Sequence, residues 1–453
     1  MNKTEKREFY KRLIVLTLPL AFQSLMLAAV AAGDAFMLGR LDQDSMSSVS
    51  LASQIQFIQN MVLSAVTSGG TILGAQYWGK GDKKTINDIF CLILRINAIV
   101  SVMFFVGCVF FPRYLMFLFA HDEVLVSRGA EYLRIAGWSY LLTGISQCYL
   151  AIMRISGHAG RSAWISSGAV LLNIGLNAVF IFGLLGFPAM GVKGAAVATL
   201  TARIVELVWA VCSSFGKTFI RPDLKRLFFR DKLLQADFRK CFLPVLGASL
   251  LWGVGFTSYT AVMGHLGGDA AAANSVSAVV RDLMCCACNG IAVAGGIIVG
   301  NRLGEGDLEK GRRYGDKLLV ISVVVGVITA VIIIALIPLT LVIADLTEQA
   351  KKNLIGMMII MAVYMIGRCI NTVVINGVFA AGGDTKFDMY SLAATMWGIA
   401  VPMSFLSAFV FGWHIYIVYA FTCIDELGKI PWVMFHFKKH KWVKDLTRDR
   451  INN

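Results

Sequence analysis

Apolar runs of about 20 residues recur along the whole chain, and they limit its possible folds more than any other feature. A hydrocarbon core of roughly 30 Å is crossed by about 20 apolar residues in a helix, which satisfies its own backbone hydrogen bonds in lipid. Only 15% of the 453 residues are charged, and no long polar segment indicates a separate soluble domain. The sequence therefore predicts an all-α polytopic membrane protein with twelve spans, at approximately 12–34, 47–74, 87–111, 131–155, 163–186, 191–215, 239–263, 270–300, 317–341, 353–380, 389–411 and 413–437.

The basic residues follow the expected topology of these spans. The alternate loops that include the N-terminal and C-terminal segments hold 30 of the 42 Lys and Arg residues, and the opposite loops hold six. By the positive-inside rule, both termini are predicted to be cytoplasmic, which requires an even number of spans. The net charge of +14 then reflects topology, so no nucleic-acid partner is expected. The first apolar run lacks a small-residue cleavage site and is interpreted as an anchor, not a removable signal peptide.

The two halves of the chain repeat each other with a shift of 225 residues. Pro19 falls on Pro244, and the loop GKGD at 79–82 falls on GEGD at 304–307. The same shift places Tyr259 opposite Asp34, so the carboxylate in the first span has no acidic counterpart in the seventh. Such internal repeats indicate that one structural unit occurs twice in the chain.

Each half carries six predicted spans, an even number, so both halves enter the membrane with the same orientation. Parallel repeats of this kind surround a central cavity and alternate access by rocking against each other. The predicted domains are an N-terminal six-helix lobe at 1–216, a cytoplasmic linker at 217–238 and a C-terminal six-helix lobe with a basic tail at 239–453.

Several motifs that could suggest an enzyme have simpler explanations. The segment GAQYWGK at 74–80 resembles a nucleotide-binding P-loop, but an apolar span precedes it and Gly81 replaces the hydroxyl residue that binds magnesium. The GKGD and GEGD loops are predicted to be tight turns in which Asp caps the next helix. Cys and His residues lack metal-ligand spacing. The sequence therefore predicts no enzyme activity, no cofactor and no structural metal site.

The chain resembles the multidrug and toxic compound extrusion (MATE) family over almost its entire length. The order and the repetition of the matching segments carry this resemblance. They are Pro19, DAFMLGRL at 34–41, GAQYWGKGD at 74–82, VGNRLGEGD at 299–307, AGGDT at 381–385 and Pro402. The resemblance implies two six-helix lobes and a secondary antiporter that exports organic cations or drugs in exchange for H+ or Na+. It implies a multi-pass protein of the bacterial plasma membrane, which we expect to be a monomer.

The resemblance also implies roles for three residues in the N-terminal half. Asp34 matches the family's span 1 aspartate, which couples H+ or Na+ binding to substrate release and could hold Na+. Asn173 and Asn177 match a span 5 pair that is often Asn and Asp, so Asp34 would carry the coupling without a second carboxylate. The alternative is that Asp34 is a solvated carboxylate at the outer end of span 1. The seventh span lacks the Glu of some members, at 250–255.

Other ionisable residues lie in the middle of predicted spans, where charge is costly unless it is paired or used. Arg203 with Glu206 has the spacing of a helical ion pair. Arg281 and Asp282 point about 100° apart on a helix, so each is expected to meet another helix. Arg368 could meet Asp282, Asp425 or Glu426, and this network is a second candidate for proton coupling. The candidates for lining the cavity are Gln54, Phe57, Trp252, Tyr259, Arg281, Asp282 and Arg368.

Three alternatives to a drug antiporter remain open. A flippase for lipid-linked oligosaccharides or lipid precursors would share the helical architecture, and unpaired arginines in the cavity would favour its anionic ligands. A major facilitator would also have twelve spans, but the loop GKGDKK at 79–84 lacks the D-R-x-G-R pattern of that superfamily. A receptor that does not transport is the third alternative.

Overall fold

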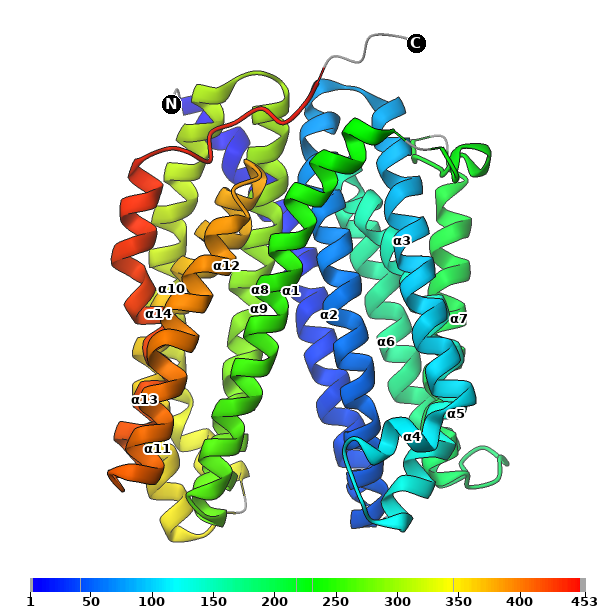
Figure 1. Ribbon diagram of the computed structural model, residues 1–453, viewed down its shortest axis with the longest axis vertical. Helices are drawn as coiled ribbons and strands as arrows, with labels where there is room; N and C mark the ends of the chain where they lie inside the picture. Colours follow the sequence, from blue (N-terminus) through cyan, green and yellow to red (C-terminus); the bar gives the residue numbers. More distant parts are fainter. Residues whose placement is uncertain (1–2, 41, 217, 230, 345, 449–453) are drawn as a thin grey trace. The chain divides into compact units, whose positions relative to one another are not determined.

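Helices make up nearly all of the computed structural model, which describes residues 3–40, 42–216, 218–229, 231–344 and 346–448 (Figure 1). At residues 31, 32, 34–36, 39, 43 and 224 only the backbone is described. The described residues contain no strand. The prediction of an all-α fold is therefore confirmed.

The contacts divide the chain into two units. The N-terminal unit comprises residues Phe22–Trp78 and Asp82–Phe238, and the C-terminal unit comprises the residues from Arg239 onward together with the chain up to Ala21 and Gly79–Gly81. Helix α1 (Lys3–Gly39) therefore contributes residues to both units. The predicted domain boundaries at 216 and 239 stay a prediction.

The N-terminal unit contains the second half of α1 and six further helices. Ser156 and Gly157 have non-helical backbone angles, with φ +84° at Gly157, and form a kink between two of these helices. The helices are α2 (Gln43–Lys80), α3 (Lys83–Phe110), α4 (Pro112–Phe117), α5 (Glu123–Met153), α6 (Ala159–Phe182) and α7 (Gly191–Ser214).

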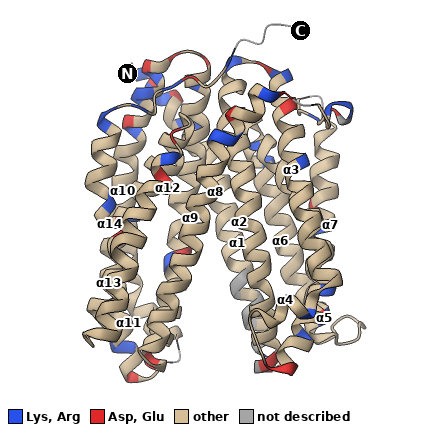
Figure 2. Ribbon diagram, viewed as in Figure 1, with Lys and Arg blue, Asp and Glu red and all other residues tan. Residues whose placement is uncertain are grey.

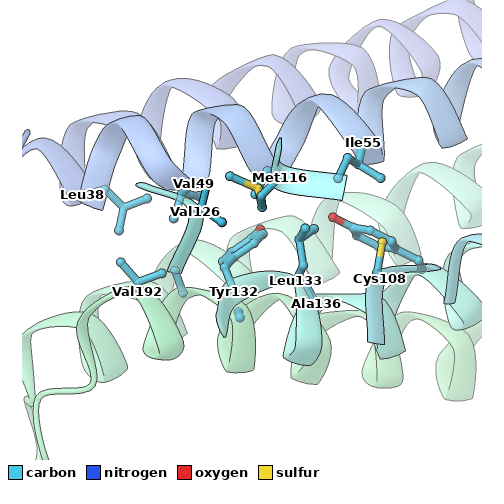
Figure 3. Packing of buried hydrophobic residues seen from close by; sticks show 14 of the residues in the cluster. Leu38, Val49, Ile55, Cys108, Met116, Val126, Tyr132, Leu133, Ala136 and Val192 are labelled. Atoms are coloured by element: carbon cyan, nitrogen blue, oxygen red, sulfur yellow. The ribbon is translucent and has the colours of Figure 1, made fainter. Parts of the chain in front are cut away.

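Apolar side chains from different helices form the core of the N-terminal unit. Leu38 of α1, Val49 of α2, Tyr132 of α5 and Val192 of α7 belong to one buried cluster (Figure 3). Gln59 crosses from α2 to α5 and donates to the backbone oxygen of Tyr140 at 2.9 Å. Helices in a membrane associate through such close packing and interhelical hydrogen bonds.

Among the described residues, the C-terminal unit contains α8 from Arg239 onward, six further α-helices and three π-helical stretches. The α-helices are α8 (Lys232–His265), α9 (Gly268–Gly304), α10 (Leu308–Ile343), α11 (Glu348–Asn371), α12 (Lys386–Leu392), α13 (Val401–Phe405) and α14 (Ile415–Lys438). The π-helical stretches Thr372–Phe379, Ala393–Ala400 and Leu406–Val410 join or extend α11, α12 and α13. In this unit, Lys and Arg gather at the ends of the helices near the chain termini (Figure 2).

The first half of α1 packs within the C-terminal unit. The rings of Phe9 and Tyr314 lie 4.7 Å apart, and Glu8 and Glu5 pair with Arg302 and Arg313, each at 3.5 Å. Phe9 and Tyr314 are each 1% exposed. These contacts tie the start of the chain to α9 and α10.

The described residues contain nine stretches that are long and apolar enough to cross a membrane. One of them, Glu123–Phe182, is 60 residues long and holds both α5 and α6. Helix α2 is not among these nine stretches because it contains many polar residues. Helix α14 is also not among them, because Asp425, Glu426 and Lys429 place three charges in its middle. The long stretch with two helices, together with α2 and α14, accounts for the difference between the nine apolar stretches and the twelve predicted spans. The exact number of membrane spans stays a prediction.

The two GxGD loops form the turns that the sequence predicts. Gly81 and Gly306 adopt φ values of +80° and +83°, a backbone region that glycine enters without steric cost. Asp82 accepts a hydrogen bond from the amide of Thr85, and Asp307 accepts one from the amide of Lys310, both at 3.0 Å. The interpretation of both loops as capped turns is therefore confirmed.

Candidate functional site

Helix α6 places two amides in the interior of the N-terminal unit. Asn173 and Asn177 are four residues apart and so share one face of the helix; they are 6% and 0% exposed. The Asn177 side-chain amide donates to the Asn173 oxygen at 3.5 Å, and the Asn173 amide donates to the Thr199 hydroxyl of α7 at 3.3 Å. These hydrogen bonds join neutral groups of α6 and α7. Asp34 lies in α1, and its side chain is outside the described part of the chain.

Helix α2 carries a polar stripe that the N-terminal unit does not cover. Ser50, Gln54 and Ser64 are exposed, and Phe57 on the same face is 41% exposed. Spacings of three, four and seven residues keep these side chains on one side of a helix. Lipid offers no hydrogen-bond partner to such polar groups, so the stripe is typical of a surface that faces water.

A pocket that is partly open to solvent lies within the C-terminal unit among α8, α9, α11, α14 and the π-helical stretch Ala393–Ala400. Three of the residues predicted to line a cavity, Trp252, Tyr259 and Arg281, line this pocket together. Trp252 stacks on Phe256 with ring centroids 5.4 Å apart. One charged group of each sign, Arg281 and Asp425, lies in its wall.

Next to this pocket, two basic residues share one buried carboxylate. Glu426 of α14 is 2% exposed, and its oxygens lie 2.6 Å from the Arg368 guanidinium and 3.5 Å from the Lys429 ammonium. The Asn371 amide also donates to Glu426 at 2.7 Å. Glu426 was one of three acids that the sequence offered as partners of Arg368, so this prediction is confirmed. The predicted pair of Arg203 and Glu206 is also present, at 2.6 Å.

The expectation that Arg281 and Asp282 would each meet another helix is confirmed for Arg281, whose guanidinium lies over the ring of Phe256 on α8. For Asp282 it is wrong, because this carboxylate pairs with Arg281 of its own helix. Two nitrogens of the Arg281 guanidinium lie 3.1 and 3.0 Å from the same Asp282 oxygen. The arginine side chain is long enough to fold back along α9, and its guanidinium lies 4.5 Å from the centre of the Phe256 ring. A difference of about 100° in direction along the helix therefore does not prevent the pair.

Several residues of the α6 amide site and of the C-terminal pocket were not predicted from the sequence. Thr199 has no motif around it, and Phe256, Tyr364 and Tyr419 are ordinary aromatic residues of apolar runs. Asn371 alone had a usable signal, because it follows Arg368 by three residues and so shares its helix face. Of the predicted cavity residues, Asp282 and Arg368 lie beside the pocket as ion-pair partners, while Gln54 and Phe57 belong to the α2 stripe of the other unit.

Comparison with known proteins gives one family match and many relatives. The family model described as MatE matches residues 19–179 and again residues 244–406. The two matches begin 225 residues apart, which equals the shift of the internal repeat.

Among curated proteins, an uncharacterised transporter of Bacillus subtilis, YisQ, is 24% identical over 89% of this chain and 88% of its own length. A probable multidrug resistance protein NorM of Thermotoga maritima is 24% identical over 100% of this chain and 97% of its own.

Solved structures show the same fold. A transporter of the MOP superfamily from Pyrococcus furiosus superposes with a TM-score of 0.86 at 17% identity, covering 95% of this chain and 96% of its own. The MATE transporter VcmN of Vibrio cholerae superposes with a TM-score of 0.87 at 15% identity, covering 97% and 100%.

Proposed function

Since the protein belongs to the MatE family of membrane transporters, whose members include multidrug efflux proteins, we propose that it is a secondary antiporter. It exports organic cations or drugs by alternating access, and H+ or Na+ moves in the opposite direction. The family relatives named as multidrug resistance proteins support the class of substrate.

The neutral amide site of α6 carries this proposal. Asn173 and Asn177 are amides and carry no charge of their own, so Asp34 is the residue that we propose holds a cation in the N-terminal unit. A carboxylate that a proton or Na+ has neutralised no longer attracts an organic cation. Competition for one carboxylate is therefore sufficient for exchange between the incoming ion and the outgoing substrate.

The polar stripe of α2 supports a water-filled passage on the route of the substrate. Gln54 offers hydrogen bonds, and Phe57 offers an aromatic face for a cation. In the C-terminal unit, Trp252 and Tyr259 offer similar surfaces. We propose that these four residues line the passage at different stages of transport, with Arg281, Asp282 and Arg368 setting the charge of its C-terminal wall.

Transport in proteoliposomes tests the proposal. Ethidium efflux would be measured with a proton gradient and a sodium gradient imposed separately on the purified protein. Asp34→Asn is expected to abolish gradient-driven efflux, while Asp44→Asn, an exposed residue at the start of α2, should leave it unchanged. If Asp34→Asn supported efflux at the wild-type rate, Asp34 would not be the coupling residue. If the wild-type protein showed no efflux under either gradient, the protein would not be an antiporter for this substrate.

The arrangement of the chain in its membrane is part of the same proposal. The excess of Lys and Arg in one set of loops supports cytoplasmic termini in a bacterial plasma membrane. The two halves, 1–216 and 239–453, would act as the two lobes, joined by the linker at 217–238. One copy of the chain contains both lobes, so the protein is expected to work as a monomer.

Lipid flipping is the second candidate, and the pairing of the arginines weighs against it. A diphosphate lipid needs basic groups that are free to bind phosphate oxygens. Arg281 is bound to Asp282 and Arg368 to Glu426. The walls of the pocket therefore favour a cation over an anionic lipid.

A further inference from the structure

The linker at 217–238 presents large apolar side chains that the N-terminal unit does not cover. Phe228 is 79% exposed, Leu233 is 62% exposed and Phe229 is 52% exposed. All three belong to one short stretch, 228–233. Exposed apolar side chains that gather in one place indicate contact with a membrane or with another molecule.

The same linker carries an excess of positive charge. It contains six Lys and Arg residues and three Asp residues. Among the described residues, Lys225 and Lys232 of the linker are exposed and form no ion pair with a carboxylate. Arg221 is also exposed, and its guanidinium donates to two backbone oxygens of the chain just before it. These three cations can therefore bind an anionic partner.

Two arginines of the linker lie over phenylalanine rings. The guanidinium of Arg221 lies 4.7 Å from the centre of the Phe215 ring, and that of Arg226 lies 4.8 Å from the centre of the Phe229 ring. Arg226 also pairs with the buried Asp88 of α3 at 3.0 Å. Arg226 therefore fixes the position of Phe229, while Arg221 keeps N–H groups that can reach a phosphate oxygen.

Contacts with α3 place the linker beside this helix and not beyond its end (Figure 1). The Asn87 side chain donates to the backbone oxygen of Arg221, and the Arg95 guanidinium donates to the backbone oxygen of Leu227 at 3.4 Å. Asn87 and Arg95 are two turns apart, which is a rise of about 12 Å. Residues 221–227 thus follow the first turns of a predicted span, at the level where the headgroups of a bilayer would lie.

A membrane surface matches both the apolar and the basic side chains of the linker. In segments that lie in the interface, Phe and Leu enter the boundary between headgroups and acyl chains, while Lys and Arg remain at the headgroups. The negative potential of anionic lipids attracts such basic segments. The loop 183–190 differs, because it exposes Leu185 and Phe187 but contains no charged residue. Charge therefore distinguishes the linker from an ordinary apolar loop.

We propose that the linker is an anchor that binds the anionic phospholipids of the cytoplasmic leaflet. Phe228, Phe229 and Leu233 enter the interface, and Lys225 and Lys232 bind the phosphate groups of the lipids. The inference goes beyond the antiporter function and depends only on the proposed position of the linker at a membrane surface.

Spin labelling of the full-length protein in lipid vesicles tests this inference. Cys212 is exposed and the other nine cysteines are buried, so Phe228→Cys in a Cys212→Ser background offers one accessible thiol to the label. Collisions with oxygen and with a water-soluble nickel chelate report the depth of the label. In vesicles that contain phosphatidylglycerol the label should lie below the headgroups. In vesicles of phosphatidylcholine alone, or at high salt, it should lie mainly in water.

Charge variants separate lipid binding from folding. Lys225→Gln combined with Lys232→Gln should lower the ratio of inserted to free label on the order of tenfold in vesicles with phosphatidylglycerol. Lys225→Arg combined with Lys232→Arg keeps both charges and should leave this ratio close to that of the parent protein. A label at Leu185→Cys is the matched control, because Leu185 is 86% exposed in an uncharged loop; its depth should be the same in both kinds of vesicle.

Two results would overturn the inference. One is an equal depth of the label at residue 228 in both kinds of vesicle, which is also the result expected if the linker binds a protein partner instead of lipid. The other is an unchanged ratio in the double Gln variant. Both leaflets of a vesicle carry the same lipids and no transport is measured, so failure here is distinct from failure of the antiporter proposal.

Discussion

The guanidinium of Arg368 on α11 lies 2.6 Å from the carboxylate of Glu426 on α14, and the Glu426 side chain is 2% exposed. Removing one member of a buried ion pair leaves the other charge without compensation. The pair therefore holds two helices of the C-terminal unit in one arrangement beside the pocket.

Arg368→Met is expected to lower the free energy of unfolding by about 3–5 kcal/mol, because Glu426 keeps only Lys429 as a cationic partner. Lys351→Met breaks the exposed pair with Glu348 and should cost about 1 kcal/mol or less. Thermal unfolding in detergent compares the two. Similar midpoints for both variants would show that burial of the Arg368 pair has no energetic consequence.

Gly79→Ala is expected to destabilise the protein by about 1–3 kcal/mol. A Cβ atom at Gly79 would overlap the backbone oxygen of Asn301 on α9, and a backbone cannot move aside as a side chain can. Gly160→Ala in α6 is the matched control, because nothing lies within 4 Å of its Cβ position; it should be neutral or stabilising by up to about 1 kcal/mol. Equal folded yields and midpoints would contradict the close approach at Gly79.

Asp42, which lies outside the membrane-spanning segments, is expected to make the stability of the protein depend on pH. A hydrogen bond from the Ser45 amide at 2.7 Å, with further bonds from the Ser45 hydroxyl and Arg128, lowers the pKa of the Asp42 carboxyl from its usual 3.8. A lowered pKa in the folded protein means that the stabilisation is present above the usual pKa and is lost as pH falls through the lowered value.

The difference in unfolding midpoint between the wild-type protein and Asp42→Asn should therefore shrink as pH falls from 6 to 3. Asp44→Asn is the control for this comparison. Asp122 is unsuitable as a control because its side chain caps helix α5. A difference that stays constant over this range would mean that the charge of Asp42 does not stabilise α2.

Several side chains of α3 hold the linker, and Asn87 makes two of these contacts. The Asn87 amide donates to the backbone oxygen of Arg221, and its oxygen accepts from the Asp223 amide at 3.1 Å. Asn87→Ala should therefore increase trypsin cleavage at Lys225 and Arg226 on the order of tenfold, since two hydrogen bonds no longer oppose local opening. Lys84→Ala, an exposed neighbour on the same helix, should cleave at the wild-type rate. Equal rates for the two variants would show that the linker is held by other contacts.

The sequence predicted the features that depend on regular helical geometry. Asn173 with Asn177, and Trp252 with Tyr259, are spaced by four and seven residues, so one helix face brings each pair together. The caps at Asp82 and Asp307 follow from local turn chemistry in the same way.

Contacts between helices were harder to predict, because they depend on tertiary packing. Some neighbours of Tyr259 in its pocket, such as Tyr364 and Tyr419, come from helices more than 100 residues away in sequence. The fold-back of Arg281 onto Asp282 depends on a side-chain rotamer that the Phe256 ring supports. Neither a repeat nor a hydropathy pattern contains this information.

The division of α1 has a consequence for the history of the protein. The family model matches the chain twice with a 225-residue period, yet residues up to Ala21 pack with the C-terminal unit. A fragment that begins at Arg239 would leave Tyr314 without the ring of Phe9 and Arg302 without the carboxylate of Glu8. The duplicated module and the module that folds are therefore not the same stretch of chain, and separately expressed halves would have to exchange this helix in order to assemble.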